Sequence, residues 1–251
     1  MKNAANLRGK TTKLSIPESI LAVALGAGLT AQADIIYNYS GPSYNIPDGD
    51  PAGVFSQITV SGALPSLSDI TVTLNLSGGY NGDLYAYLSY NGALVPLLNR
   101  VGVGSSPSTT SAVGYSDSGF HLTLSDSGAN GDIHLYQKVN NYSSLIANGT
   151  STWTPDGRDS SPLSDPAQFD SASRLTLDNT FGGMDPNGTW TLFFADVSTG
   201  GGTSMLNGWS LNITAVPEPR TVALAVVGAL AAVIKLILRR RLAHRMPHDA
   251  F

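Results

Sequence analysis

The sequence of 251 residues contains no cysteine, so no disulfide can cross-link it. Any folded domain must be held by packing, hydrogen bonds, ion pairs or bound ions. Between residues 34 and 215 there is also no glutamate, and fifteen aspartates face only four basic residues, which gives a formal charge of −11. The basic residues of this segment are Arg100, Lys138, Arg158 and Arg174. Nucleic-acid binding requires a basic surface, so the composition argues against it.

The segment from 34 to 215 also lacks any stretch with a sustained helical period. Apolar residues alternate with polar ones instead, as in Ile70-Thr71-Val72-Thr73-Leu74, and the same alternation occurs around Phe120, Trp190 and Trp209. Asn-Gly, which favours tight hairpin turns, occurs six times, and Leu84 to Leu98 predicts a hairpin that turns at Asn91-Gly92. We therefore expect an all-β domain, an antiparallel β-sandwich or jelly roll, over residues 34–215.

Two parts of this segment do not alternate. Residues 102–118 are rich in serine and glycine and predict a loop. Residues 149–173 contain Trp153, prolines and aspartates and predict a long excursion from the sheet. Asp156 and Asp159 stand there among prolines and glycines, so we expect them to be solvated.

Near the C-terminal end, the sequence has an apolar run from Thr221 to Leu238 whose single charged residue is Lys235. As a helix, eighteen residues rise about 27 Å, close to the roughly 30 Å hydrocarbon thickness of a bilayer. Arg239, Arg240 and Arg241 follow directly. We expect a transmembrane helix at 221–238 and a cytoplasmic tail at 242–251, with a buried core helix as the alternative.

The N-terminal residues 1–33 have the pattern of a secretory signal peptide. Four basic residues precede an apolar stretch from Ile20 to Thr30, and Ala31-Gln32-Ala33 is a small-x-small cleavage site. Cleavage after Ala33 would leave Asp34 as the first residue of an exported domain. The alternative is a helix of a bundle, which Gly26 and Gly28 would weaken.

The junction before the apolar run carries a specific motif. Val216-Pro217-Glu218-Pro219, the run itself and the arginines resemble a PEP-CTERM sorting signal over 216–241. The resemblance implies a Gram-negative bacterium, recognition by an exosortase-type processing enzyme, and anchoring in the inner membrane before delivery to the cell surface or an extracellular matrix containing exopolysaccharide. Lys235 within the run and residues 242–251 after the arginines depart from the family pattern.

A second resemblance concerns the domain. Tyr80-Asn81-Gly82-Asp83-Leu84, Phe181-Gly182, Gly188-Thr189-Trp190-Thr191-Leu192, Asp196 and Leu206-Asn207-Gly208-Trp209-Ser210-Leu211 occur in this order. The succession resembles the P domain, or Homo B domain, of subtilisin-like proprotein convertases. It covers about residues 54–213, with a poor match at 102–173. Gly78 replaces a histidine that is usual in the family.

The resemblance and the residues leave the chemistry of individual side chains open. Trp190 and Trp209 either pack in the core or stack on sugar rings. Asp83 and Asp196 either cap turns or ligate a cation such as calcium, which some members of the family bind. Gly202-Thr203-Ser204-Met205 matches the start of a subtilase nucleophile motif, but strand-like residues follow it, and no catalytic residue is assigned.

Three functions are compatible with these observations. The first is a non-catalytic, surface-delivered P-domain module that binds or stabilises an extracellular partner protein. The second is a serine-type endopeptidase or a peptidase-associated protein, although 182 exported residues cannot hold a subtilase domain as well. The third is a matrix protein or adhesin that binds polysaccharide through exposed aromatic residues such as Trp153, Tyr85 and Tyr87.

The sorting motif can be tested by replacing Pro217, Glu218 and Pro219 with alanine in a host that has an exosortase. Each proline fixes its own φ and extends the preceding residue, so we expect the variant to remain in the membrane fraction without being processed. The size and location of both proteins on immunoblots check this expectation. Identical processing of wild type and variant would reduce the motif to a linker.

Overall fold

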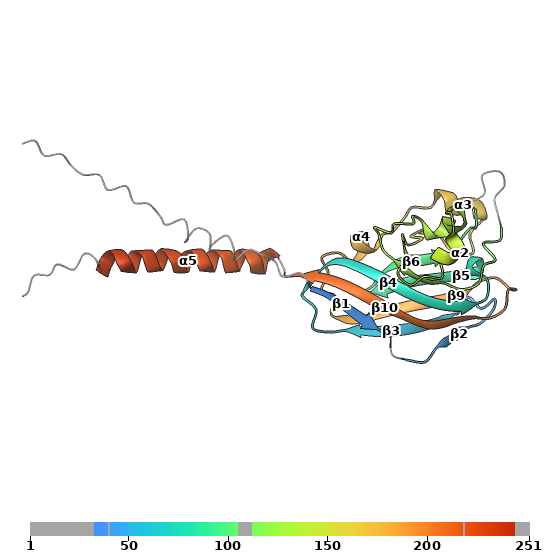
Figure 1. Cartoon of the computed structure of the whole chain (residues 1–251), viewed down its shortest axis with the longest axis horizontal. Coiled ribbons are helices and arrows are strands. Elements are labelled where there is room, and N and C mark those ends of the chain that lie inside the picture. Colours follow the sequence, from blue (N-terminus) through green and yellow to red (C-terminus); the bar gives the residue numbers. More distant parts are fainter. Residues whose placement is uncertain (1–32, 40, 105–111, 218, 244–251) are drawn as a thin grey trace, which may run out of the picture. The chain divides into compact units, whose positions relative to one another are not determined.

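The computed structural model describes residues 33–39, 41–104, 112–217 and 219–243 (Figure 1). These residues form two units, a β domain up to Pro217 and a single C-terminal helix. Residues 1–32 of the predicted signal peptide, including Ala31, lie outside the described residues, as do Glu218 and residues 244–251.

The β domain consists of two antiparallel sheets, apart from one short parallel pair between β7 and β8. The first sheet has the order β1-β10-β4-β7-β8, and β2 also pairs with β10. Its strands are β1 (Ala33–Asn38), β2 (Tyr44–Ile46), β4 (Ser66–Gly78), β7 (His121–Leu124), β8 (Thr152–Trp153) and β10 (Ser204–Val216). The second sheet has the order β3-β9-β5-β6. Its strands are β3 (Val54–Val60), β5 (Leu84–Tyr90), β6 (Ala93–Asn99) and β9 (Gly188–Asp196).

The core lies between the two sheets, and β4, β5 and most of β9 bury every second side chain toward it. In β4, Ile70, Val72 and Leu74 are fully buried, while the threonines between them are partly exposed. β9 buries Trp190, Leu192 and Phe194 in the same way. The predicted all-β sandwich is therefore confirmed.

The predicted hairpin is confirmed as β5 and β6. Tyr90 pairs with Ala93, so Asn91 and Gly92 form a two-residue turn. Their φ angles are 50° and 83°, the left-handed values that this kind of turn requires and that asparagine and glycine tolerate best.

The chain leaves the sheets between β7 and β9 and forms a long excursion there, residues 125–187, which returns to the first sheet only at β8. Its short helices are η2 (Ile133–Lys138), α2 (Tyr142–Leu145), α3 (Pro166–Ser171) and α4 (Leu177–Phe181). One or two turns are too short to show a helical period, so the sequence did not predict them. Trp153 in this excursion is fully buried, and its predicted role as an exposed sugar-binding residue is wrong.

Helix α5 (Pro219–Ala243) forms the second unit and contains the predicted helical run at 221–238. It begins at proline, whose fixed φ and missing N–H suit the first helical position. Among the residues that the structure describes, no helix is both long and apolar enough to cross a membrane. The prediction of a helix is thus confirmed, whereas that of a membrane span is not.

Candidate functional site

The two strand tryptophans belong to the core. Trp190 stacks on Tyr90 with ring centroids 4.1 Å apart and an interplanar angle of 7°, and its indole N–H donates to the Pro186 carbonyl at 2.9 Å. The indole N–H of Trp209 donates to the hydroxyl of Ser56 at 2.8 Å. Both side chains are at least 96% buried, which leaves neither face free for a sugar ring.

Asp83 and Asp196 are brought together at one end of β5 and β9. Asp83 ends the short helix η1 (Asn81–Asp83), and the next residue, Leu84, pairs with Asp196 across the sheet. One carboxylate oxygen of Asp196 accepts from the Ser198 N–H at 3.2 Å. The other, Oδ2, is buried and has no partner among the described residues.

Burial and mutual repulsion disfavour the charged forms of this pair. Burial, together with the negative charge of Asp196, raises the pKa of Asp83 to about 6, although Arg100 opposes the shift. Burial also raises the pKa of Asp196, against the effect of the N–H groups of Ser198 and Gly49. Both carboxyl groups therefore keep a proton to a higher pH than an exposed aspartate does.

The pair does not by itself fit calcium. Calcium takes six or more oxygen ligands, and two carboxylates supply only part of such a set. Within the described part of the chain, no three histidine or acidic side chains are grouped so as to hold a metal ion. Calcium binding therefore stays a prediction from the sequence.

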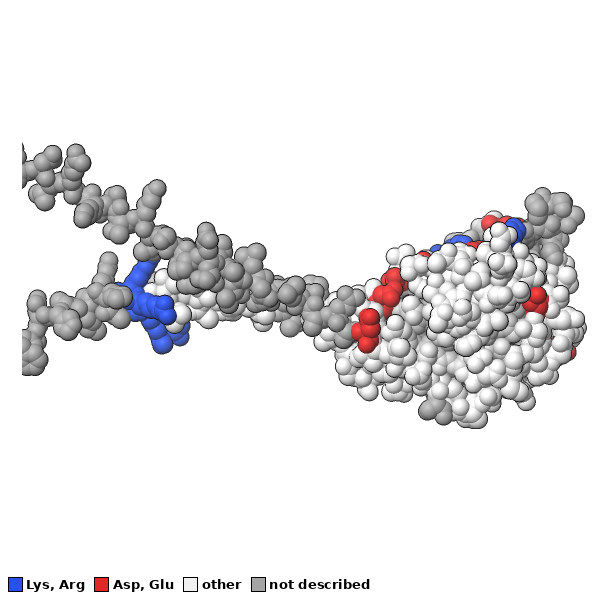
Figure 2. All heavy atoms as spheres, viewed as in Figure 1, with Lys and Arg blue, Asp and Glu red and all other residues white. Residues whose placement is uncertain are grey.

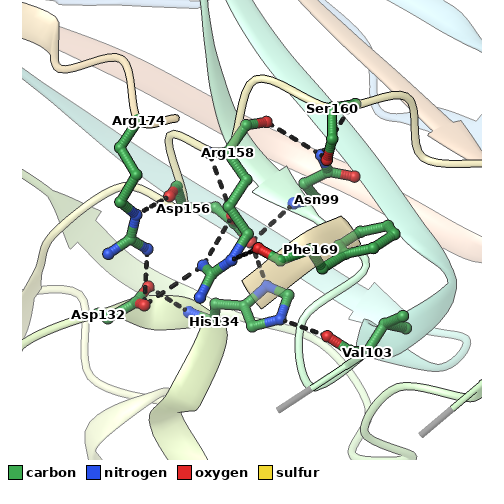
Figure 3. A network of polar contacts seen from close by, with 9 residues as sticks. All are labelled: Asn99, Val103, Asp132, His134, Asp156, Arg158, Ser160, Phe169 and Arg174. Carbon is green, nitrogen blue, oxygen red and sulfur yellow. Dashed lines mark hydrogen bonds and ion pairs between the residues drawn. The ribbon is translucent and has the colours of Figure 1, made fainter. Parts of the chain in front are cut away.

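A buried network of charged side chains joins the excursion to β6 (Figure 3). Asp156 lies at its centre, fully buried, and its Oδ2 accepts from the backbone N–H of Asn99 at 3.1 Å. Its Oδ1 accepts from Arg158 at 3.1 Å. Asp132 then contacts both Arg158, at 3.3 Å, and Arg174, at 2.6 Å. The sequence-based expectation of a solvated Asp156 is wrong, because the carboxylate is buried and forms an ion pair with Arg158 inside the domain.

His134 is the other fully buried member of this network. Its Nδ1 lies 2.6 Å from Asp156 Oδ2, and its Nε2 lies 2.9 Å from the carbonyl oxygen of Val103. Both neighbours are hydrogen-bond acceptors, so both ring nitrogens must carry a hydrogen for both bonds to form. Neither nitrogen is left to accept a proton from a nucleophile.

The charge state of Asp156 agrees with this arrangement. Burial alone would raise its pKa, but His134 and Arg158 outweigh burial and hold the pKa below the usual value. Asp156 is thus an ionised carboxylate paired with Arg158 and hydrogen-bonded to His134. Sequence reasoning missed the network because its members are up to 75 residues apart in a region without strand alternation.

Ser204, the residue of the subtilase-like motif, is the first residue of β10. It is fully buried, and its hydroxyl donates to the Gly78 carbonyl at 3.4 Å. The expected strand context of this serine is confirmed. A serine nucleophile needs a base within hydrogen-bond reach, and within the described part of the chain the Ser204 hydroxyl is bonded to Gly78 and to no histidine.

The outer face of the second sheet carries a group of aromatic side chains, here called the aromatic face: Phe55, Tyr85, Tyr87 and Phe193. Phe55, Phe193 and Tyr87 are paired in register across β3, β9 and β5. The rings of Tyr87 and Phe193 stack with centroids 4.8 Å apart, and Phe55 is 65% exposed. Of the residues named as exposed aromatics from the sequence, Tyr85 and Tyr87 lie on this face, partly exposed.

The residues of the two processing signals are placed at the ends of elements. Ala33 is the first residue of β1 and pairs with Ala215. Val216 ends β10, Pro219 begins α5, and Arg239, Arg240 and Arg241 lie near the end of α5. These positions do not test cleavage or sorting, which stay predictions.

The similarity of this chain to known proteins is low. No family model matches the sequence, and no curated protein matches it. Two solved structures have a TM-score of 0.38: the serine protease of Aeromonas sobria, 14% identical over 74% of this chain, and the complex of that protease with the chaperone ORF2, 18% identical over 78%. The matches cover 27% and 29% of those chains. Likeness at this level establishes neither a shared fold nor a shared function.

The Asp83–Asp196 pair generates a prediction for stability. The pKa of Asp83 is higher in the folded state, so the folded protein retains a proton that the unfolded chain has lost. The free energy of unfolding should therefore fall as the pH rises from about 4 through about 6. Asp83→Asn should weaken this fall and raise the melting temperature relative to wild type at pH 7.5.

Thermal melts of the full chain from pH 4 to 8 check this prediction. Asp170→Asn, at an exposed aspartate, is the matched control and should melt like wild type at every pH. Equal pH dependence of Asp83→Asn and wild type would contradict it. Calcium binding is tested by the same melts in the presence of calcium and in the presence of a chelator. Identical melting curves in the two conditions would contradict it.

Proposed function

We propose that this protein is a non-catalytic, exported binding module that contacts an extracellular partner protein through its aromatic face. The observation that carries the proposal is the in-register row of Phe55, Phe193 and Tyr87 on the outer surface of a sheet. Strand residues on an outer face are ordinarily polar, and here three neighbouring strands carry large rings. Tyrosine and phenylalanine are enriched where proteins bind one another.

The surroundings of the aromatic face support a protein partner. The outward side chains beside it on β3, β5 and β9 are uncharged, including Gln57, Ser89 and Thr191. Gln57 and Thr191 are hydrogen-bonded to each other at 3.2 Å across the strands. An apolar centre flanked on these strands by neutral polar side chains matches the anatomy of a protein interface. The stacked rings of Tyr87 and Phe193 have little conformational freedom to lose on binding.

Two observations support the absence of catalysis and speak against the alternative of a serine-type endopeptidase. Both ring nitrogens of His134 face acceptors, and Ser204 is buried in a strand. Hydrolysis by a serine needs a base that can take its proton and a nucleophile that substrate can reach.

Export and sorting are part of the proposal and are supported by the two ends of the sequence. The domain's last strand, β10, ends at Val216, and α5 begins at Pro219. The Val-Pro-Glu-Pro motif therefore joins the domain to the helix without any further linker. We propose that an exosortase-type enzyme recognises this junction and that the domain then reaches the cell surface or the extracellular matrix.

The aromatic face can be tested in producing cells with a photo-crosslinking phenylalanine analogue at position 55 of the full chain. We expect one predominant adduct with a surface protein, because Phe55 is at the exposed end of the row. Changing Tyr87 and Phe193 together to serine should lower its yield at least tenfold. Mass spectrometry of the adduct identifies the partner.

The matched control places the same analogue at Ile36, which is 63% exposed on β1 of the other sheet. This position should give no comparable adduct. Equal adducts from positions 55 and 36, or none from position 55, would contradict the proposed interface.

A further inference from the structure

A second surface, on the outer face of the first sheet, contains a pocket of about 240 Å³. The residues that line it are Asn38, Tyr39, Thr73, Asn75, Gly208, Trp209 and Ser210, and of these Trp209 has its side chain buried in the core. Asn38, Ser210 and Thr73 are paired in register across β1, β10 and β4, and Gly208 pairs with Asn75 in the next row. The pocket is thus formed by the pairing of the strands rather than by a loose loop.

The local geometry of β10 opens this pocket. β1 pairs with β10 from Ser210 onward, and β2 pairs with it only up to Leu206. The register between β10 and β4 also shifts between Leu206 and Gly208, as at a β-bulge. Bulges re-aim side chains and are frequent beside binding sites.

Packing does not explain why position 208 is glycine. Its φ is outside the left-handed range, and a Cβ placed there would meet no atom within 4 Å. Glycine inside a strand weakens the strand, so it marks a bulge or a place where another molecule approaches closely. The bulge supplies the curvature, and the missing side chain keeps the floor of the pocket clear.

Most of the polar side chains that line the pocket have no hydrogen-bond partner among the described residues. The side chains of Asn38, Asn75 and Ser210 form no hydrogen bond with the described residues. The hydroxyl of Thr123 donates to the Gly149 carbonyl at 2.9 Å, so the Thr73 hydroxyl, 2.8 Å from it, must be the donor to Thr123. Thr73 therefore offers only acceptor positions to the pocket, while the amides and Ser210 offer both donors and acceptors.

Charge excludes several classes of ligand. None of the lining residues is acidic or basic, and charged side chains lie mainly toward the margins of the face seen in Figure 2. An anionic ligand would find no cationic group there and would be repelled by the formal charge of −11 on residues 34–215. The volume is below the roughly 300 Å³ at which pockets for drug-sized ligands begin, so the occupant is small.

From these observations we propose that the pocket binds one sugar ring of a neutral polysaccharide. Sugar hydroxyls both donate and accept, as the free amides and hydroxyls of the pocket require. Tyr39 also borders the pocket, while its ring packs against the core and its hydroxyl donates to Tyr44 at 3.1 Å. This proposal does not rest on the aromatic face, which belongs to the other sheet.

The test uses the purified full chain and a panel of neutral oligosaccharides, namely cellohexaose, maltohexaose, mannohexaose and galactohexaose, with oligogalacturonate as the anionic comparison. We expect titration calorimetry to detect binding of at least one neutral oligosaccharide and none of oligogalacturonate. Gly208→Val should weaken that binding at least tenfold, because its side chain fills the floor of the pocket. Its melting temperature should stay within a few degrees of wild type, since the space there is open.

Thr59→Val, at an exposed position on β3 of the other sheet, is the matched control and should bind like wild type. Asn75→Ala provides a second variant if Gly208→Val fails to fold, and it should also weaken binding. Lack of binding by every neutral oligosaccharide, equal binding of oligogalacturonate, or unchanged affinity in folded pocket variants would overturn the proposal.

Discussion

The carboxylate of Asp156 is the contact on which the second half of the β domain depends. Without cysteine, the excursion between β7 and β9 must be attached to the sandwich by non-covalent contacts. Asp156 accepts from β6 through the Asn99 N–H, from η2 through His134, and from Arg158. A buried carboxylate is costly unless its charge is paired and its oxygens are hydrogen-bonded, and here both conditions are met. These contacts hold η2 and the backbone around Arg158 against β6.

This arrangement determines what the His–Asp pair can do. A buried histidine 2.6 Å from an aspartate has the outward form of a catalytic dyad. In a hydrolase, the second ring nitrogen would face a nucleophile, whereas here it faces the Val103 carbonyl. This geometry supports a structural role for the pair, and we propose that binding takes place on the outer faces of the two sheets. One face presents aromatic rings and the other a neutral polar pocket, because alternation along each strand places one side in the core and the other in solvent.

The sandwich could be predicted from the sequence because alternation with a period of two is local. Ile70, Val72 and Leu74 show it directly, and the turn at Asn91-Gly92 follows from the conformational preferences of two residues. The excursion could not be predicted in this way, because its residues are buried by contacts with distant parts of the chain. Asp156 and Trp153 were consequently expected to be exposed and are buried.

In the candidate sites, too, single residues could be identified from the sequence, whereas their grouping depends on contacts between distant parts of the chain. Asp83 and Asp196 were singled out as strand-end carboxylates, but their proximity depends on the pairing of β5 with β9 across more than 100 residues. The alignment of Phe193 with Phe55 and Tyr87 likewise required the strand register.

The proposed function depends on the His134–Asp156 pair being structural rather than part of a hydrolytic site. Nitrogen-15 NMR of the histidine side chains at pH 7 tests it most directly. The account predicts that both ring nitrogens of His134 carry protons that exchange slowly with water, one bonded to Asp156 and the other to Val103. A neutral ring with one bare nitrogen, able to accept a proton from a nucleophile, would contradict it.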